Sequence, residues 1–401
     1  MTKPLAGYRV ADFSHVMAGP YATHLLTLLG AEVIKIEPPA GDAFRAYRGD
    51  RRFDGMSAAF AAVNAMKKSI ALDLKDADDV QIARQVIERS DVLIENFRPG
   101  VIGRLGFSYD DVRAYNPDIV YCSISGYGQE GPYRDWPAID NIVQATSGMM
   151  MLGGGEGDPP VRVGFPIVDT LTGQTAAIAI LSALLRRERS AGGSYIDVSM
   201  LNASLAFMTS ALTPFLLAGE ELPRMGNTGY SGLPGSALFS TRDGRHISLG
   251  VVLPKQFAAL AEYLGREDWL SDPRYMTPET QRTHFDALHA ELAQEFAKRD
   301  AASLESEMSE RGIPCGMVRR VGEAAELMGD AGFEAIELRA TPPGGRSVMP
   351  NAGFHMHPGS SPASAAPPPL DGDRDEILAW LAEPPARDGE VESAGREDCD
   401  T

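Results

Sequence analysis

The sequence predicts an α/β protein built on a Rossmann-like, doubly wound parallel sheet. Short apolar runs alternate with helical segments through the first 200 residues, as strands and helices do in such a sheet. The first of these segments, residues 8–37, has the strand–helix–strand order of a βαβ unit. Polar or glycine-rich residues follow several expected strands, at the sheet edge where open α/β sheets bind ligands.

The elements of this sheet can be placed in chain order. The expected strands are residues 8–14, 32–37, 92–95, 119–123 and 195–200. The expected helices are residues 19–29, 77–89, 170–187 and 201–219. Polar residues and Pro214 interrupt the last of them, so we expect a buried helix there and no membrane span.

A second domain is expected where the chain becomes rich in Gly and Pro, near residue 219. The Asp243-Gly244 pair between two apolar runs predicts a β-hairpin. Helices are expected at residues 255–264, 279–298, 301–310 and 374–381. The expected domains are a large Rossmann-like domain (1–218), a small α+β domain (219–325), a return segment that completes the large domain (326–383, with an extended connection at 360–369) and a disordered acidic tail (384–401).

The composition argues against several classes of function. The 55 acidic residues outnumber the 37 basic ones and give a net charge of -18, which is unsuited to nucleic acid. Three scattered cysteines offer no paired ligands, and we expect no metal site. The first 15 residues do not resemble an export signal, so we expect a cytoplasmic protein without a membrane role.

Two nucleotide-binding motifs are missing. Without a Gly-x-Gly-x-x-Gly sequence after the first strand, a dehydrogenase is disfavoured and Glu37 lacks the context of a ribose contact. Without a P-loop, a reaction driven by ATP has no support. The sequence therefore favours chemistry that needs neither cofactor.

Two other segments carry polar groups at the expected ligand edge. His15 follows the first strand and suits either ligand binding or local packing. Asn96-Phe97-Arg98 follows the strand at 92–95 and suits an adenine and phosphates, although from the residues alone a turn at Asn96 with a helix starting at Pro99 is the better explanation.

Asp169 is the candidate nucleophile. It stands where the apolar helix is expected to begin, and Asp is also a preferred N-cap residue. The two roles are compatible, since a helix N-terminus is expected to lower the pKa of a carboxyl group and keep it ionised. The glycine-rich segment 228–235 suits either a mobile cover or a passive linker.

Together these segments resemble the class III CoA-transferase family, also called formyl-CoA transferase-like, from about residue 5 to about residue 381. The segments that carry the resemblance are residues 12–20 (DFSHVMAGP), 29–38 (LGAEVIKIEP), 68–73 (KSIALD), 95–100 (ENFRPG), 123–132 (SISGYGQEGP) and 193–201 (GSYIDVSML). Their agreement in chain order makes the resemblance specific.

The resemblance implies a CoA-transferase in which Asp169 forms a covalent aspartyl-CoA intermediate. Acyl-CoA and small carboxylic acids would be its substrates, with no permanently bound cofactor, and the protein would be an interlocked, ring-shaped homodimer. The loop of Gly229, Gly232 and Gly235 would close over Asp169. The residues implied to line the CoA are His15, Val16, Ala18, Leu72, Asn96, Phe97, Arg104 and Met200.

The sequence departs from the family pattern in places that bear on substrate choice. Met17 stands where oxalate-using relatives have a glutamine, and Pro137 stands where some relatives have a lysine near CoA. Arg45 and Arg48 are candidates to pair with a second carboxylate of a dicarboxylic acid or with CoA phosphates.

Two other functions remain as alternatives. An α-methylacyl-CoA racemase of the same fold needs a histidine in a Gly-His-Asp run, and this chain has Ala138-Ile139-Asp140 instead. A noncatalytic acyl-CoA-binding protein would keep the pocket without needing Asp169 or the glycine loop.

Overall fold

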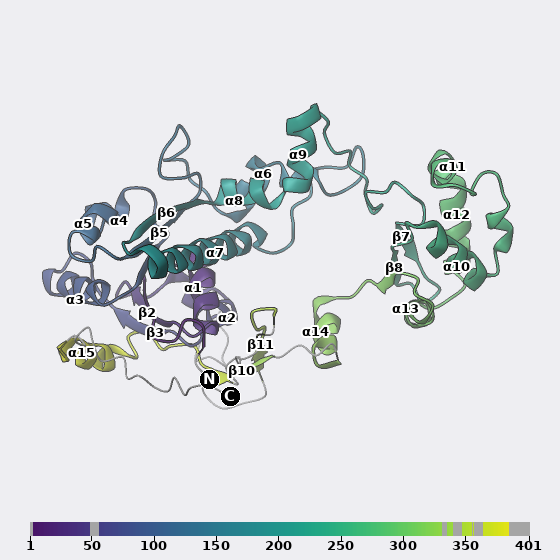
Figure 1. The fold of residues 1–401 in the computed structure, drawn as a ribbon. Coiled ribbons are helices and arrows are strands. Elements are labelled where there is room, and N and C mark those ends of the chain that lie inside the picture. The colour runs from purple at the N-terminus through teal and green to yellow at the C-terminus, as the bar shows by residue number, and fades with distance from the viewer. Residues whose placement is uncertain are drawn as a thin grey trace, which may run out of the picture. The chain divides into compact units, whose positions relative to one another are not determined.

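The chain forms two compact units in a computed structural model that describes residues 3–48, 56–330, 335–339, 347–354, 356 and 364–384. The larger unit comprises residues 1–147, 165–207 and 333–401, and the smaller comprises residues 148–164 and 208–332. Figure 1 shows the elements of each unit along the chain. The expected acidic tail, apart from Pro384, lies outside the described residues.

A six-stranded parallel sheet forms the centre of the larger unit, with the strand order β3-β2-β1-β4-β5-β6. The strands are β1 (Arg9–Asp12), β2 (Glu32–Glu37), β3 (Lys68–Ala71), β4 (Val92–Glu95), β5 (Val120–Ser125) and β6 (Ser194–Ser199). The order reverses between β1 and β4, as in a doubly wound Rossmann sheet, which confirms the predicted parallel α/β architecture. All five expected strands are present, whereas β3 was not expected.

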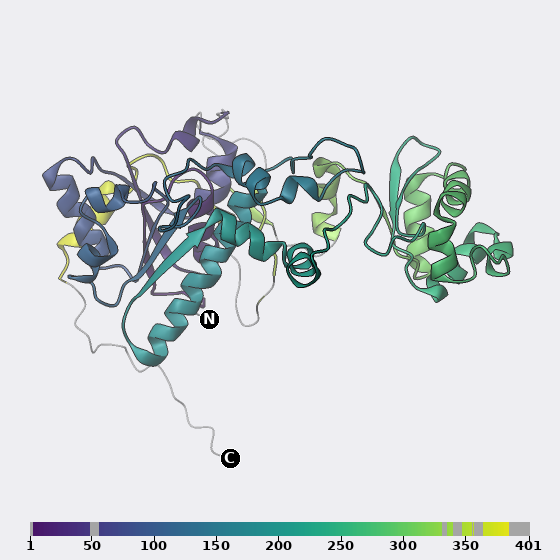
Figure 2. The ribbon, with the colours of Figure 1, turned by 90° about the horizontal axis from the view of Figure 1, so that it is seen from above.

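Helices cover both faces of this sheet, as a parallel sheet requires. Apolar side chains of α1 (Ala18–Leu28) and α7 (Ile167–Ser190) pack against one face, where Figure 2 shows α7 as a long helix. Side chains of α3 (Ala77–Glu88), α5 (Tyr109–Arg113) and α15 (Arg374–Ala382) pack against the other face. The remaining short helices of this unit are η1 (Ala43–Ala46), α2 (Ala58–Asn64), α4 (Val101–Arg104), α6 (Asp140–Thr146) and α8 (Met200–Phe207).

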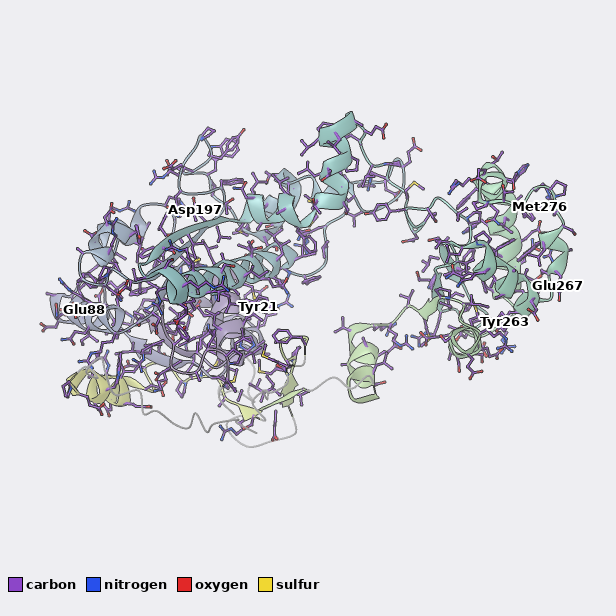
Figure 3. The ribbon with its side chains drawn as sticks, viewed as in Figure 1. Tyr21, Glu88, Asp197, Tyr263, Glu267 and Met276 are labelled. Atoms are coloured by element: carbon purple, nitrogen blue, oxygen red, sulfur yellow. The ribbon has the colours of Figure 1, made fainter. Side chains whose placement is uncertain are left out.

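Helices α1 and α7 approach closely because Gly173 has no side chain. A Cβ atom at Gly173 would lie 2.6 Å from the Ala18 carbonyl oxygen and 3.0 Å from the ring of Tyr21. Tyr21 is labelled on α1 in Figure 3. This contact fixes where α7 begins relative to the turn after β1.

The C-terminal segment packs on the larger unit. The Asp373 and Asp371 carboxylates accept hydrogen bonds from the backbone N–H groups of Ser69 and Ala71, both at 2.8 Å. Arg89 on α3 donates to two carbonyl oxygens at the end of α15. A second sheet in this unit has the order β11-β10-β12, formed by β10 (Ile336–Leu338), β11 (Ser347–Met349) and β12 (Ser364–Ala365).

The smaller unit contains a three-stranded antiparallel sheet with the order β7-β8-β9, covered by helices. The strands are β7 (Leu238–Ser240), β8 (His246–Leu249) and β9 (Cys315–Met317). The helical segments are α9 (Thr209–Ala218), η2 (Met149–Met151), α10 (Pro254–Leu264), η3 (Glu267–Leu270), α11 (Pro278–Thr283), α12 (Phe285–Phe296), α13 (Ala301–Glu310) and α14 (Val321–Asp330). The predicted hairpin is confirmed, with Gly244 at φ 73° in its turn. The helix expected at 279–298 is two helices, α11 and α12, separated at His284.

The prediction of one buried helix over residues 201–219 is wrong. The structure has two helices there, α8 and α9, separated at Met208. None of the α9 residues is buried, and the side chain of Leu217 is 83% exposed.

Helix α7 is long and apolar enough to cross a membrane by length and composition alone. Half of its most apolar stretch is buried inside the protein, as expected for a core helix.

Candidate active site

The ligand edge of the sheet is formed where β1 and β4 end side by side. The turn after β1 and the turn after β4 are joined by Asn96, whose Oδ1 accepts from the His15 backbone N–H at 2.9 Å. Its Nδ2 donates to the His15 carbonyl oxygen at 2.8 Å. Asn96 therefore holds the backbone of the His15 turn, and its amide is occupied by that turn.

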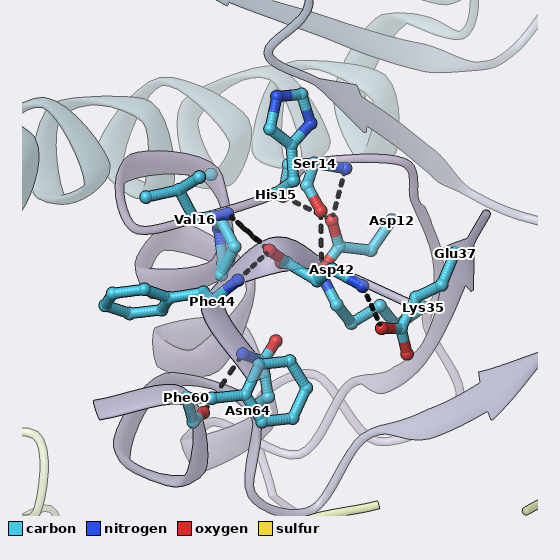
Figure 4. Close-up of polar contacts among 12 residues, drawn as sticks. Asp12, Ser14, His15, Val16, Lys35, Glu37, Asp42, Phe44, Phe60 and Asn64 are labelled. Atoms are coloured by element: carbon cyan, nitrogen blue, oxygen red, sulfur yellow. Dashed lines mark hydrogen bonds and ion pairs between the residues drawn. The ribbon is translucent and has the colours of Figure 1, made fainter. Parts of the chain in front are cut away.

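Val16 adopts a left-handed backbone conformation, with φ 65°, which is uncommon for a β-branched residue. The Asp42 carboxylate accepts from the Val16 N–H at 3.0 Å and from the Phe44 N–H at 2.9 Å. The buried Lys35 ammonium lies 3.2 Å from Asp42 and donates to the Ser14 carbonyl oxygen at 2.7 Å. Figure 4 shows how these groups surround the turn. The strained turn is thus fixed by a buried ion pair.

A second buried ion pair supports the base of the same turn. The Lys67 ammonium lies 3.0 Å from the Asp12 carboxylate, and both side chains are fully buried. Burial raises the pKa of Asp12, but the charges of Lys67 and Lys35 outweigh it and lower that pKa to about 2. Asp12 also accepts from the hydroxyl groups of Ser14 and Thr23, so its charge is well satisfied.

Most of the described basic residues between positions 45 and 68 form ion pairs within the protein. Arg45 forms an ion pair with the buried Glu37 at 2.6 Å, so neither Arg45 nor Glu37 is free for a ligand. Lys67 pairs with Asp12, and Lys68 pairs with Glu32. Arg48 is exposed and, among the described residues, has no acidic partner. Arg51 and Arg52 lie outside the described residues.

A cavity of about 410 Å³ opens beside these turns, within the larger unit. Three of the residues predicted to line the CoA, His15, Leu72 and Phe97, form part of its wall. The His15 and Phe97 rings have centroids 5.2 Å apart. Burial lowers the pKa of His15, which leaves its imidazole neutral at pH 7. The volume and the flat rings suit a small aromatic ligand group.

Lys75 also lines this cavity and was not among the predicted site residues. Lys75 follows β3, the strand that was not expected, so its place at the ligand edge could not be inferred. The other predicted CoA residues do not line the cavity. Val16 and Arg104 are exposed, Ala18 and Met200 are buried at the starts of α1 and α8, and Asn96 holds the His15 turn.

Asp169 is the third residue of α7, in its first turn. The expectation that Asp169 caps this helix is wrong, because the helix begins at Ile167 and its N-terminus is capped from α6. The Asp140 Oδ2 atom accepts from the Val168 N–H at 2.7 Å and from the Asp169 N–H at 3.2 Å. The Asp169 side chain is therefore left free of a capping role.

The expected lowering of the Asp169 pKa is also wrong. Burial, and to a smaller extent the charge of Asp140, together raise the pKa of Asp169 to about 7. A helix dipole contributes about 0.3–1 kcal/mol, which is too little to offset such a change. Within the described part of the chain, no donor lies within hydrogen-bond distance of the Asp169 carboxylate. Asp169 is thus a partly buried carboxyl group with a raised pKa.

The glycine loop belongs to the smaller unit. A Cβ atom at Gly229 would lie 2.2 Å from Ser236 Oγ, and one at Gly235 would lie 2.8 Å from the Val251 carbonyl oxygen. Gly232 has φ 62°. Gly235 therefore allows close backbone packing and Gly232 a left-handed turn, whereas the close contact at Gly229 is with a side-chain hydroxyl group.

A doubly wound parallel sheet with a cavity beside the turns that follow β1 and β4 is the arrangement in which α/β proteins bind ligands. A model of CoA-transferase family III matches residues 5–374. The chain therefore belongs to CoA-transferase family III, and it is a CoA-transferase.

Named relatives support this assignment. The chain is 40% identical to an acetyl-CoA:oxalate CoA-transferase of Acetobacter aceti, over 81% of this chain and 83% of that protein. It is 35% identical to a formyl-CoA:oxalate CoA-transferase of Streptomyces avermitilis, over 93% of this chain and 94% of that protein. It is 37% identical to a succinyl-CoA:glutarate CoA-transferase of Mus musculus, over 79% of this chain and 72% of that protein.

Solved structures give the same result for the fold. A crystal structure of a CAIB/BAIF family protein from Brucella suis matches with a TM-score of 0.86 and 28% identity, over 95% of this chain and all of that one. The fold is thus shared along almost the whole chain.

Proposed function

We propose that the protein moves CoA from a donor acyl-CoA to a dicarboxylic acid through an acylated Asp169. The observation that carries the proposal is the Asp169 carboxyl group itself. It is partly buried, it has a pKa raised to about 7, and its own oxygens cap no helix. A carboxylate that is poorly stabilised by its surroundings is well suited to attack a thioester.

The proposed reaction passes the acyl and CoA groups over Asp169 in balanced steps. Asp169 Oδ attacks the thioester carbon of the donor, which breaks the C–S bond and gives a mixed anhydride and CoA thiolate. The thiolate attacks the aspartyl carbonyl, releases the donor acid as a carboxylate and leaves an aspartyl-CoA thioester. The acceptor carboxylate then repeats these steps in reverse order, so the new acyl-CoA forms and Asp169 returns as a carboxylate.

The cavity beside the His15 turn is the proposed site of the CoA nucleotide. The neutral His15 ring and the Phe97 ring give flat apolar surfaces for an adenine. Lys75 at the cavity wall supplies a positive charge for a phosphate group.

A dicarboxylate acceptor is proposed because Arg48 remains available. Arg45 pairs with Glu37, whereas the exposed Arg48 has no acidic partner among the described residues. The relatives named for oxalate and glutarate act on acids of this type. Arg48 would bind the carboxylate that does not react.

Exchange assays with a panel of acids test this proposal. Succinyl-CoA is offered with oxalate, glutarate, acetate and propionate, and new acyl-CoA is measured by chromatography. Asp169→Ala should lower exchange by about 10⁴-fold or more, because the nucleophile is lost. Arg48→Ala should raise KM for dicarboxylates only, and Arg113→Ala, at an exposed site on α5, is the control. Activity with monocarboxylates alone, or an unchanged Asp169→Ala enzyme, would contradict the proposal.

We further infer a homodimer, as the resemblance to the family implies, and a cytoplasmic location. Sedimentation equilibrium and cell fractionation test these two inferences.

A further inference from the structure

Asp140 contacts the backbone of Asp169 in the first turn of α7. It is the first residue of α6, and its carboxylate is held on both oxygens. Gln144 Nε2 donates to Oδ1 at 2.6 Å, and the backbone N–H groups of Val168 and Asp169 donate to Oδ2. A side chain from one helix thus fixes the first turn of another.

We propose that Asp140 is a positioning residue for the transfer reaction, which fixes the first turn of α7 and keeps a negative charge beside the nucleophile. The proposal rests on the proposed role of Asp169. Two consequences follow from the geometry. The backbone of Asp169 is held in place, and ionised Asp169 lies beside a second anion.

The second anion favours acylation. When Asp169 attacks a thioester, its carboxylate becomes part of a neutral anhydride or thioester, and the repulsion from Asp140 is relieved. The starting carboxylate is therefore destabilised relative to the covalent intermediate. The raised pKa of Asp169 is consistent with this arrangement, although burial is the larger cause.

Other charges near Asp169 do not account for this effect. The other charged side chains of α7, beginning at Arg186, lie about 25 Å along the helix from Asp169. Helix α8 carries no charged residue. The titratable side chains on the other elements that contact α7 are Tyr21 and His24 on α1, Tyr121 and Cys122 on β5, and Tyr195 and Asp197 on β6. Among the described residues, Asp140 is the charged group that acts on the pKa of Asp169.

The test compares Asp140→Asn with Asp140→Ala. Asparagine keeps an oxygen that can accept from the two backbone N–H groups but removes the charge, whereas alanine removes both. Asp135→Asn is the matched control, since Asp135 is an exposed acid in the same segment and pairs with Arg134. The measurements are kcat and KM for acyl-CoA between pH 5 and pH 9, with circular dichroism to confirm folding.

In the wild type, kcat/KM should rise with pH with a midpoint near 7, because ionised Asp169 is the nucleophile. In Asp140→Asn the midpoint should fall but stay above the usual aspartate range, because burial remains, and KM for acyl-CoA should change little. Asp140→Ala should lose about 100-fold in kcat, as expected when a nucleophile is misplaced. Asp135→Asn should keep the wild-type midpoint.

An Asp140→Asn midpoint equal to that of the wild type would overturn the inference. A failure of this inference can be distinguished from a failure of the proposed function, because acylation of Asp169 in the wild type is measured separately by mass spectrometry. If the wild type is acylated at Asp169 and the Asp140→Asn midpoint does not move, the inference alone fails. If Asp169 is never acylated in an active enzyme, both fail.

Discussion

Replacing Asp169 by asparagine should stabilise the protein, and the gain should grow with pH. The pKa of Asp169 is about 7 in the folded protein and about 3.8 in an unfolded chain. At about 1.4 kcal/mol per pKa unit, ionised Asp169 destabilises the folded state by up to about 4 kcal/mol at pH 8. Asparagine keeps the shape of the side chain without this charge.

The direction of the pH dependence follows from proton binding. Below about pH 4 the carboxyl group is protonated in both states, so ionisation contributes nothing. Between pH 4 and pH 7 the unfolded chain has lost this proton while the folded protein keeps it, and the wild-type free energy of unfolding falls as pH rises. The advantage of Asp169→Asn should therefore grow by about 2.6 kcal/mol between pH 5 and pH 8.

Urea unfolding at pH 5, 6, 7 and 8, followed by circular dichroism, measures this difference. Hydrogen exchange of α7 identifies the transition that belongs to the larger unit. Asp135→Asn, at an exposed site, is the control and should show no such trend. A constant difference between Asp169→Asn and the wild type at every pH would refute the reasoning, because Asp169 would then have an ordinary pKa.

Two further substitutions test the framework of the site. Gly173→Val should destabilise the larger unit by about 2 kcal/mol, since the new side chain would meet the Ala18 carbonyl oxygen. Gln174→Val is the control, because Gln174 is exposed on the same helix, and it should not destabilise the unit. Equal unfolding midpoints for the two variants would contradict this packing. Asp42→Ala should lower the free energy of unfolding by about 3 kcal/mol, because it leaves the buried Lys35 charge unpaired. It should also raise KM for acyl-CoA, because it releases the turn after β1. An unchanged KM would show that this turn does not bind CoA.

Much of the fold could be predicted from local sequence patterns. Strands β2 and β4 span the residues expected, because their apolar runs are bounded by polar or glycine residues. The hairpin of β7 and β8 followed from its Asp-Gly turn. Strand β3 was missed because its four residues, Lys68–Ala71, include two polar ones and lack a clear alternation. Missing β3 also concealed Lys75.

The environment of Asp169 could not be predicted, because it depends on a contact between distant residues. A local pattern made Asp169 a helix cap, but Asp140, 29 residues earlier, occupies that role across two helices. Similarly, the apolar composition of residues 209–218 indicated burial, whereas the structure leaves that helix exposed. Local sequence gives the type of an element, and tertiary packing decides what its side chains contact.

Covalent trapping tests the central claim most directly. The wild type and Asp169→Asn are incubated with an acyl-CoA, treated with hydroxylamine, digested and examined by mass spectrometry. Acylation should convert Asp169 of the wild type to a hydroxamate on the peptide that spans the start of α7, and the variant should show none. An active wild-type enzyme with an unmodified Asp169 peptide, or with the modification on another residue, would contradict the account.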